Sequence, residues 1–364
     1  MEVQIKLDKK VLHYTSEDQV SGHVVLRSDT ELDIATIAIN LSGQATSRLE
    51  SGKLNETHKA CSATTALNTI RLTQMKKLFQ RNEQIFPPVN CAGWFTSAAV
   101  TIPPGEHSFP FSIMFPQVSE CYKGSTRDAV RKRSADRPPH HLLRKLPPSS
   151  GNFNTPEEIR YSLEAIITQN GLMYRTHRAT RQISFHPVSA IPKPSQSVVV
   201  RKTVTCNKKA AGLLCPPLTY EIQAELVNGP FVLLGHPIAL SVKVTNINDE
   251  KPDVSLRDFQ SMLIETTDIR AHGIMQSATR SWIIQTMTNL GQPFSSAMPA
   301  SGMLMTLDDA VWSRHRLPHC LTPTFETCNV TRSYKLEIRL GIEFGRNNSR
   351  ILEFLFPVRV LSPS

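Results

Sequence analysis

Tyr334-Lys-Leu-Glu-Ile-Arg-Leu-Gly-Ile-Glu-Phe344 alternates apolar residues with polar or small ones along its whole length. Successive side chains of an extended strand point to opposite faces, so apolar residues at every second position indicate a strand with one buried face. A helix would repeat its apolar residues every three or four positions instead. The stretch therefore predicts a β-strand that packs one face onto a hydrophobic core.

The same alternation recurs along the rest of the chain, most clearly in residues 37–41, 107–115, 161–167, 238–244 and 352–360. Pro- and Gly-rich turns separate these runs, a pattern typical of antiparallel sheets packed as sandwiches. Residues 67–79 are ambiguous, because their apolar residues fit a short helix about as well as an extended segment. We therefore predict an all-β fold.

The length of 364 residues favours two domains, because a single hydrophobic core stops growing below that size. Alternation stops after Phe185 in a Pro-rich stretch and restarts at Tyr220. We expect a first domain at 1–190 and a second at 215–364. The connection between them, 191–214, can itself pair at the edge of a sheet.

Composition and cysteine usage indicate a globular cytoplasmic protein. Hydrophobic residues make up 40% and charged residues 20%, the proportions of an ordinary folded domain. The apolar runs are too short to cross a bilayer, and the N-terminus alternates like a strand rather than resembling a signal peptide. Seven cysteines, an odd and scattered set, favour reduced thiols over a disulfide framework.

The net charge of +10 is concentrated in one stretch, residues 122–145, which we interpret as a basic insertion in the first domain. Its eight basic residues outnumber Asp128 and Asp136 by six. They are Lys123, Arg127, Arg131, Lys132, Arg133, Arg137, Arg144 and Lys145. The insertion either attracts anionic lipid headgroups or phosphorylated tails, or is a solvated loop without a function. No aromatic side chains are interleaved with the charges, which argues against nucleic acid as the partner.

Several blocks of sequence resemble the strands of the arrestin fold. In chain order they are Tyr14–Leu26, Ile37–Gly43, Ile102–Phe111, Leu146–Ser149 followed by Ile159–Leu163, and Asn329–Leu336. These blocks follow one another in the order found in that family. The order includes Phe109-Pro-Phe111 and then the proline pair before Ile159. The chain is most similar in style to the arrestin-like (α-arrestin) proteins of fungi. The resemblance implies two antiparallel immunoglobulin-like β-sandwich domains in tandem, with no catalytic site.

The resemblance also implies a function. Proteins of this family are adaptors that recognise cytoplasmic segments of membrane transporters or receptors, and many recruit a HECT-type ubiquitin ligase, so that cargo is ubiquitinated and internalised. We accordingly expect a cytoplasmic protein that is recruited to the plasma membrane or endosomes. Two alternatives stay open: a structural sorting or coat subunit similar to the arrestin-like component of retromer, and a scaffold that binds anionic lipid.

Recruitment of the ligase in this family uses proline-proline-x-tyrosine motifs, usually in a long tail. The nearest match here is Pro216, Pro217 and Tyr220, which has one residue too many before the tyrosine. The extra residue moves the tyrosine out of register with a groove that binds an extended proline segment. Ligase binding is therefore expected either directly, through this degenerate motif, or through another adaptor.

No metal, cofactor or catalytic site is predicted. His315, His319, Cys320 and Cys328 have residue types that bind zinc, but Pro318 disfavours the helical turn that usually places two such histidines together. Asp308 and Asp309 are interpreted as a solvated turn, because neighbouring residues of a strand face opposite ways. Cys61, Cys91 and Cys121 are interpreted as structural thiols. The motifs of hydrolases, phosphate-binding loops and dinucleotide-binding enzymes are missing from the sequence.

Overall fold

The computed structural model of the chain describes residues 1–9, 11–51, 70–88, 100–120, 145–170, 175–190, 192, 196–206, 209–210, 213–214, 217–247, 254–296, 304–345 and 348–363. The chain forms two compact units. Unit 1 comprises Met1–Val188, Asp268–Ser277 and Phe325–Thr331, and unit 2 comprises Ser189–Thr267, Ala278–Thr324 and Arg332–Ser364. Unit 1 thus includes two short segments from the second half of the chain.

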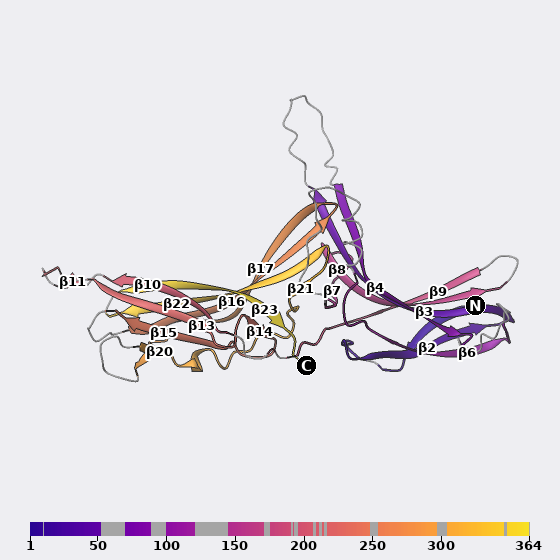
Figure 1. Cartoon of the computed structure of the whole chain (residues 1–364), viewed down its shortest axis with the longest axis horizontal. Helices are drawn as coiled ribbons and strands as arrows, with labels where there is room; N and C mark the ends of the chain where they lie inside the picture. Colours follow the sequence, from indigo (N-terminus) through magenta and orange to yellow (C-terminus); the bar gives the residue numbers. More distant parts are fainter. Residues whose placement is uncertain are drawn as a thin grey trace, which may run out of the picture. The chain divides into compact units, whose positions relative to one another are not determined.

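Unit 1 contains two antiparallel sheets (Figure 1). The first sheet has the order β1-β2-β6, with β1 at Glu2–Leu7, β2 at Gln19–Ser28 and β6 at Gly105–Met114. The second sheet is built around β3, which lies between β4 and β8; β5 also pairs with β3, and β7 and β9 pair with β8. Its bounds are β3 Leu32–Ser51, β4 Ile70–Phe86, β5 Val100–Ile102, β7 Ser150–Gly151, β8 Glu157–Gln169 and β9 Arg175–Ile183.

The core of unit 1 comes from every second residue of these strands, as the alternation requires. Ile37, Ile39 and Leu41 of β3 are fully buried, and so are Tyr161 and Leu163 of β8. Burying one such large apolar side chain stabilises the fold by about 1.5–3 kcal/mol. The core also contains four residues of the second half, Ile269, Ala271, Phe325 and Val330. The two C-terminal segments are therefore part of the hydrophobic core of unit 1.

Unit 2 contains a five-stranded sheet of order β10-β13-β15-β20-β19 and most of a seven-stranded sheet that includes the path β14-β23-β22-β16-β17. The first sheet has β10 Val198–Cys206, β13 Leu218–Leu226, β15 Leu240–Asn246, β19 Ser295–Ser296 and β20 Leu304–Thr306. The second has β14 Phe231–Leu233, β16 Val254–Ala271, β17 Ile274–Met287, β18 Gln292–Pro293, β21 Phe325–Glu326, β22 Val330–Phe344 and β23 Ser349–Leu361. The short pair β11 (Lys209–Ala210) and β12 (Leu213–Leu214) and the 3-10 helix η2 (Asp309–Val311) complete the described elements.

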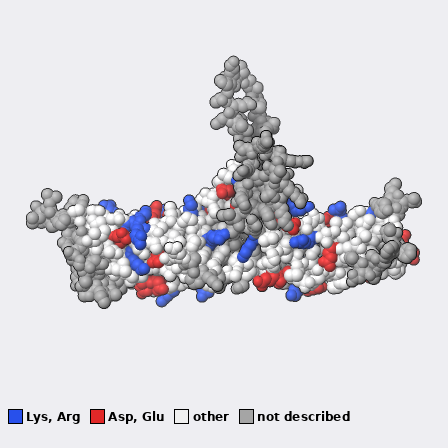
Figure 2. Space-filling model, in the orientation of Figure 1, with Lys and Arg blue, Asp and Glu red and all other residues white. Residues whose placement is uncertain are grey.

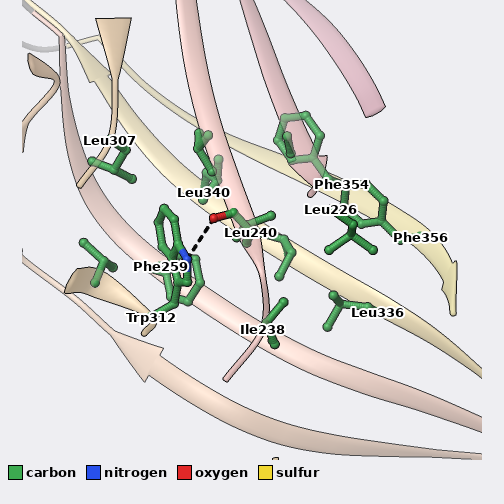
Figure 3. Packing of buried hydrophobic residues seen from close by; sticks show 14 of the residues in the cluster. Leu226, Ile238, Leu240, Phe259, Leu307, Trp312, Leu336, Leu340, Phe354 and Phe356 are labelled. Carbon is green, nitrogen blue, oxygen red and sulfur yellow. Dashed lines mark hydrogen bonds between the residues drawn. The ribbon is translucent and has the colours of Figure 1, made fainter. Parts of the chain in front are cut away.

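The core of unit 2 surrounds Trp312 (Figure 3). The Trp312 ring stacks on Phe259 with 5.6 Å between ring centroids. Its indole N–H donates to the carbonyl oxygen of Leu240 at 3.0 Å, so the polar atom of this buried side chain is paired. A buried tryptophan needs such a partner, because an unpaired donor in the core costs about 1–3 kcal/mol.

The predicted all-β fold is confirmed. The decisive stretch from Tyr334 to Phe344 lies in β22, and its alternate residues Tyr334, Leu336 and Ile338 are buried. The ambiguous residues 67–79 are extended from Ile70 onward, as part of β4. In the expected connection, Val198–Cys206 pairs with β13 at an edge of the five-stranded sheet, which the sequence left open. The domain limits at 190 and 215 stay a prediction.

Candidate protein-binding surface

Two neighbouring residues of β3, Ser47 and Arg48, point to opposite faces of the sheet and organise the structure on both sides. Ser47 is fully buried on the core face, where alternation places an apolar residue elsewhere along the strand. Its hydroxyl donates to the carbonyl oxygen of Arg270 at 2.5 Å. The hydrogen bond joins β3 to the end of β16, which belongs to the same unit.

Asn329 holds the second C-terminal segment against the same point of β3. Its side chain is 2% exposed, and its amide nitrogen donates to the carbonyl oxygen of Ala45 at 3.0 Å. The same nitrogen lies 3.2 Å from Ser47 Oγ and 3.3 Å from the carbonyl oxygen of Gln74 on β4. An amide nitrogen has two hydrogens to donate, so these oxygens share them. Asn329 therefore bridges the β3–β4 ladder.

The turn between β16 and β17 also contacts β4. His272 and Gly273 form a two-residue connection with φ of 51° and 84°, the left-handed values that such a hairpin requires. The backbone N–H of His272 donates to Gln74 Oε1 at 3.3 Å. Its Nε2 lies 3.2 Å from the carbonyl oxygen of Thr73, to which a protonated Nε2 donates. These contacts stabilise a histidine where asparagine is the usual residue.

On the outer face, Arg48 organises the loop between β7 and β8. Its guanidinium donates to the carbonyl oxygens of Asn152 and Thr155 at 3.3 and 3.1 Å. The same group forms an ion pair with Glu158, whose side chain is 9% exposed. The Arg48 backbone N–H donates to the carbonyl oxygen of Pro156 at 2.7 Å. A planar guanidinium can make all the side-chain contacts at once because its donors form a fixed fork.

The loop also holds itself together. The hydroxyl of Thr155 accepts from the backbone N–H of Asn152 at 2.7 Å, and Asn152 Oδ1 accepts from the N–H of Asn154 at 2.8 Å. Gly151 has φ of 67°, and a Cβ there would lie 1.9 Å from the carbonyl oxygen of Glu157. Only glycine fits that position. The loop 152–156 is therefore fixed by its own hydrogen bonds and by Arg48.

This fixed loop presents an aromatic side chain to solvent. Phe153 is 79% exposed, and the Arg48 guanidinium lies 5.5 Å from its ring centroid. Met75 of β4 is 62% exposed and pairs with Thr46, which places it on the same face of the sheet as Arg48. Exposed aromatic side chains held by a rigid frame lose little conformational entropy when a partner covers them. We define Met75, Arg48 and Phe153 as the outer-face surface of unit 1.

The predicted basic and proline sites lie mostly outside the described residues. Of the basic insertion only Lys145 is described, and it is exposed; the seven other basic residues lie in 121–144, outside the described ranges. On the face that Figure 2 displays, basic and acidic side chains are interspersed. Pro216 is outside the described residues and Pro217 is exposed. Tyr220 is 2% exposed and its ring lies 4.7 Å from that of Phe344, within the core of unit 2.

The four candidate zinc ligands are not brought together as a site. Among the residues that the structure describes, no three His, Cys, Asp or Glu side chains gather as a metal ion would require. His315 and His319 are exposed, and the His319 ring packs against Gly235. Asp308 caps η2, with its carboxylate accepting from the N–H of Ala310 at 3.0 Å, which is the turn that the sequence indicated. Cys61, Cys91 and Cys121 lie outside the described residues.

The sequence did not predict the outer-face surface. Its partners are far apart along the chain, and Arg48 and Phe153 belong to no local motif. The sequence did carry a signal for the contact on the opposite, core face of β3: Ser47 interrupts the apolar series of alternate residues between Ala45 and Leu49. A polar residue on the buried face of a strand requires a hydrogen-bond partner, and this one finds it in β16.

Comparison with known proteins agrees with this architecture. Residues 3–128 match the family model described as Arrestin (or S-antigen), N-terminal domain. Over these residues the chain is similar to arrestins. The match includes Ser47, Arg48 and Met75 and ends before Phe153.

The chain is also similar to a protein of the yeast Lachancea thermotolerans named "Arrestin-related trafficking adapter 10". The two are 26% identical over 148 residues, which is 40% of this chain. The match spans 33% of the length of the yeast protein, so the chain covers about a third of that relative. In the described part of the chain, no helix is long and apolar enough to cross a membrane.

Proposed function

We propose that the chain is a non-catalytic adaptor in the trafficking of membrane proteins. It binds a cytoplasmic segment of a transporter or receptor and supports its ubiquitin-dependent endocytosis. The observation that carries the proposal is the outer-face surface of unit 1, where Phe153 projects from a loop that Arg48 fixes. The trafficking role in the name of the yeast relative supports the same class of function.

The binding mode follows from the surface. An exposed phenylalanine and methionine fit an apolar pocket or the apolar face of a cargo segment, and aromatic anchors of this kind contribute most of the binding energy in many interfaces. The guanidinium of Arg48 is occupied by Glu158 and two carbonyl oxygens. Arg48 therefore positions the loop, and the cargo contacts the apolar side chains.

Recruitment of a ubiquitin ligase is proposed to use another site or another adaptor rather than Tyr220. A partner groove would need to surround the tyrosine ring, and here the ring is buried in the core of unit 2. Exposing it would remove a large apolar side chain from that core, at a cost of about 3–5 kcal/mol. We place the protein in the cytoplasm, with recruitment to the plasma membrane or endosomes through its cargo.

The experiment compares cargo uptake in cells that lack the endogenous protein and express variants of it. Phe153→Ala combined with Met75→Ala is expected to slow the internalisation of the affected transporters about thirtyfold, as the loss of two anchors of about 1 kcal/mol each implies. Met114→Ala is the matched control, because Met114 is 52% exposed on β6 of the same unit. If the double variant internalises its cargo as the control does, the proposed surface is not the cargo site.

A further inference from the structure

Strand β17 lies at an edge of the seven-stranded sheet and lacks the features that usually keep an edge strand from pairing with another chain. It runs from Ile274 to Met287, pairs with β16, and has no partner on its other side among the described strands. Residues 274–281 are all exposed, so both faces of that part are open to solvent. Native proteins protect long edges with lysine, proline or bulges, because the unpaired backbone groups are a template for another strand. In β17 the only charged residue is Arg280.

The sequence of this edge is complementary to itself about Ser281. Small or β-branched residues precede Ser281, in Ser277-Ala-Thr279, and large residues follow it, in Trp282-Ile-Ile284. In an antiparallel pair centred on Ser281, residue 280 faces residue 282 of the second strand, 279 faces 283, and 278 faces 284. Each small residue of one strand then lies opposite a large residue of the other.

The chemistry of the facing pairs is favourable. Arg280 would face the partner's Trp282, and arginine over an indole is an attractive pair; within the chain its guanidinium already lies 5.3 Å from that ring centroid. Thr279 would face Ile283, which is 63% exposed, and cross-strand pairs of β-branched residues stabilise sheets. The two Arg280 side chains do not face each other in this register, so no like charges meet directly across the pair.

We propose that two copies of this chain pair antiparallel through Ala278–Ile284 of β17, with the two-fold axis at Ser281. A foreign peptide is a weaker candidate, because an edge with a single charge offers little to distinguish one sequence from another. Trp282 and Ile284 pack against the core of unit 2 while still partly exposed, and the second strand would cover them. An edge contact of seven residues is small, so the dimer is weak, with a Kd on the order of 10–100 µM.

Thr279 and Ile283 give a test that depends on the register. Both side chains are exposed, so charged residues at these positions bury no charge in the folded chain. Thr279→Lys with Ile283→Lys places lysine opposite lysine twice in the dimer. Thr279→Glu with Ile283→Lys places glutamate opposite lysine twice, with two ion pairs replacing the two repulsions.

Sedimentation equilibrium of the 364-residue chain over about 1–200 µM measures the dimer directly, in the range expected for a small interface. We expect the wild type to approach two chain masses, the lysine–lysine variant to weaken dimerisation at least about tenfold, and the glutamate–lysine variant to dimerise as well as the wild type or better. Ile351→Lys is the control, because Ile351 is 71% exposed on β23 of the same sheet. A wild type that stays monomeric, or charge variants that behave alike, would overturn the proposal.

Discussion

At the scale of single residues, Asn329 determines how one C-terminal segment joins unit 1. Replacing it by leucine keeps the approximate volume and removes the amide donors, so the carbonyl oxygens of Ala45 and Gln74 lose buried contacts. We expect Asn329→Leu to lower the free energy of unfolding by about 2–4 kcal/mol, measured by urea denaturation. Asn82→Leu, at an exposed position of β4, should change it by less than about 0.5 kcal/mol. Equal effects of the two changes would contradict the bridging role.

His186 makes the stability of unit 1 depend on pH. Burial lowers the pKa of its imidazole, and the nearby His13, whose ring centroid is 5.5 Å away, lowers it further. The folded state therefore binds a proton less readily than the unfolded state, whose histidine has a pKa of about 6.5. This histidine makes the free energy of unfolding fall as the pH drops through that value, and its effect levels off below the lowered folded pKa.

The measurement is thermal unfolding of the wild type and of His186→Gln between pH 7.5 and 5. The variant should lose less stability over this interval, because glutamine does not titrate. His107→Gln, at a position of β6 outside this pair, is the comparison. The same pH dependence in the wild type and the His186 variant would show that the histidine pair does not carry the effect.

At the scale of elements, the alternation of apolar residues predicted the regular strands but did not predict the bulge in β4. In β4 the register with β3 shifts between Gly43 and Gln44, so that Leu78 is an extra residue opposite the ladder. Leu78 and Phe79 are consecutive and both buried, which no period-two pattern predicts. The backbone carbonyl of Leu78 accepts instead from the N–H of Glu120 at 2.6 Å. A bulge fixed by a distant segment leaves no signal that a local pattern can detect.

The conformation of the loop 152–156 depends on the side chain of Arg48. Arg48→Ala removes three carbonyl or carboxylate contacts at once, and the amides of Asn152, Asn154 and Thr155 should exchange hydrogen faster by about tenfold or more, as the loss of more than 1.4 kcal/mol implies. Arg48→Lys should not restore protection, because an ammonium lacks the fork geometry.

The matched control for this loop is Arg160→Ala, since Arg160 lies 3.9 Å from the same Glu158 carboxylate and is 47% exposed. An exposed ion pair contributes about 0–1 kcal/mol, so exchange in the loop should barely change. If both alanine variants accelerate exchange equally, the carboxylate rather than the arginine fixes the loop. Cargo uptake by Arg48→Ala should fall with Phe153 still present, which would separate positioning from direct contact.

At the scale of the whole molecule, the sequence predicted an all-β chain of two domains but not the composition of unit 1. Ser47 and Arg270, which share a hydrogen bond, are 223 positions apart, and no local pattern connects them. Strand β16 was visible as one run of residues, yet its end from Asp268 onward belongs to unit 1 and its remainder to unit 2. Periodicity assigns a residue to a face of a strand and does not say which core that face meets.

This composition predicts that the first half of the chain does not form a stable unit by itself. A fragment of residues 1–188 lacks Ile269, Ala271, Phe325 and Val330, all at most 5% exposed in the core of unit 1. The core side chains that these four residues cover would be exposed to water. Each large apolar side chain contributes about 1.5–3 kcal/mol to a total stability of about 5–15 kcal/mol. Hydrogen exchange in β3 and β8 should therefore be much faster in the fragment than in the whole chain. Adding residues 189–364 as a separate fragment should restore part of the protection. Equal protection in the fragment alone and in the whole chain would show that unit 1 is stable without the C-terminal segments.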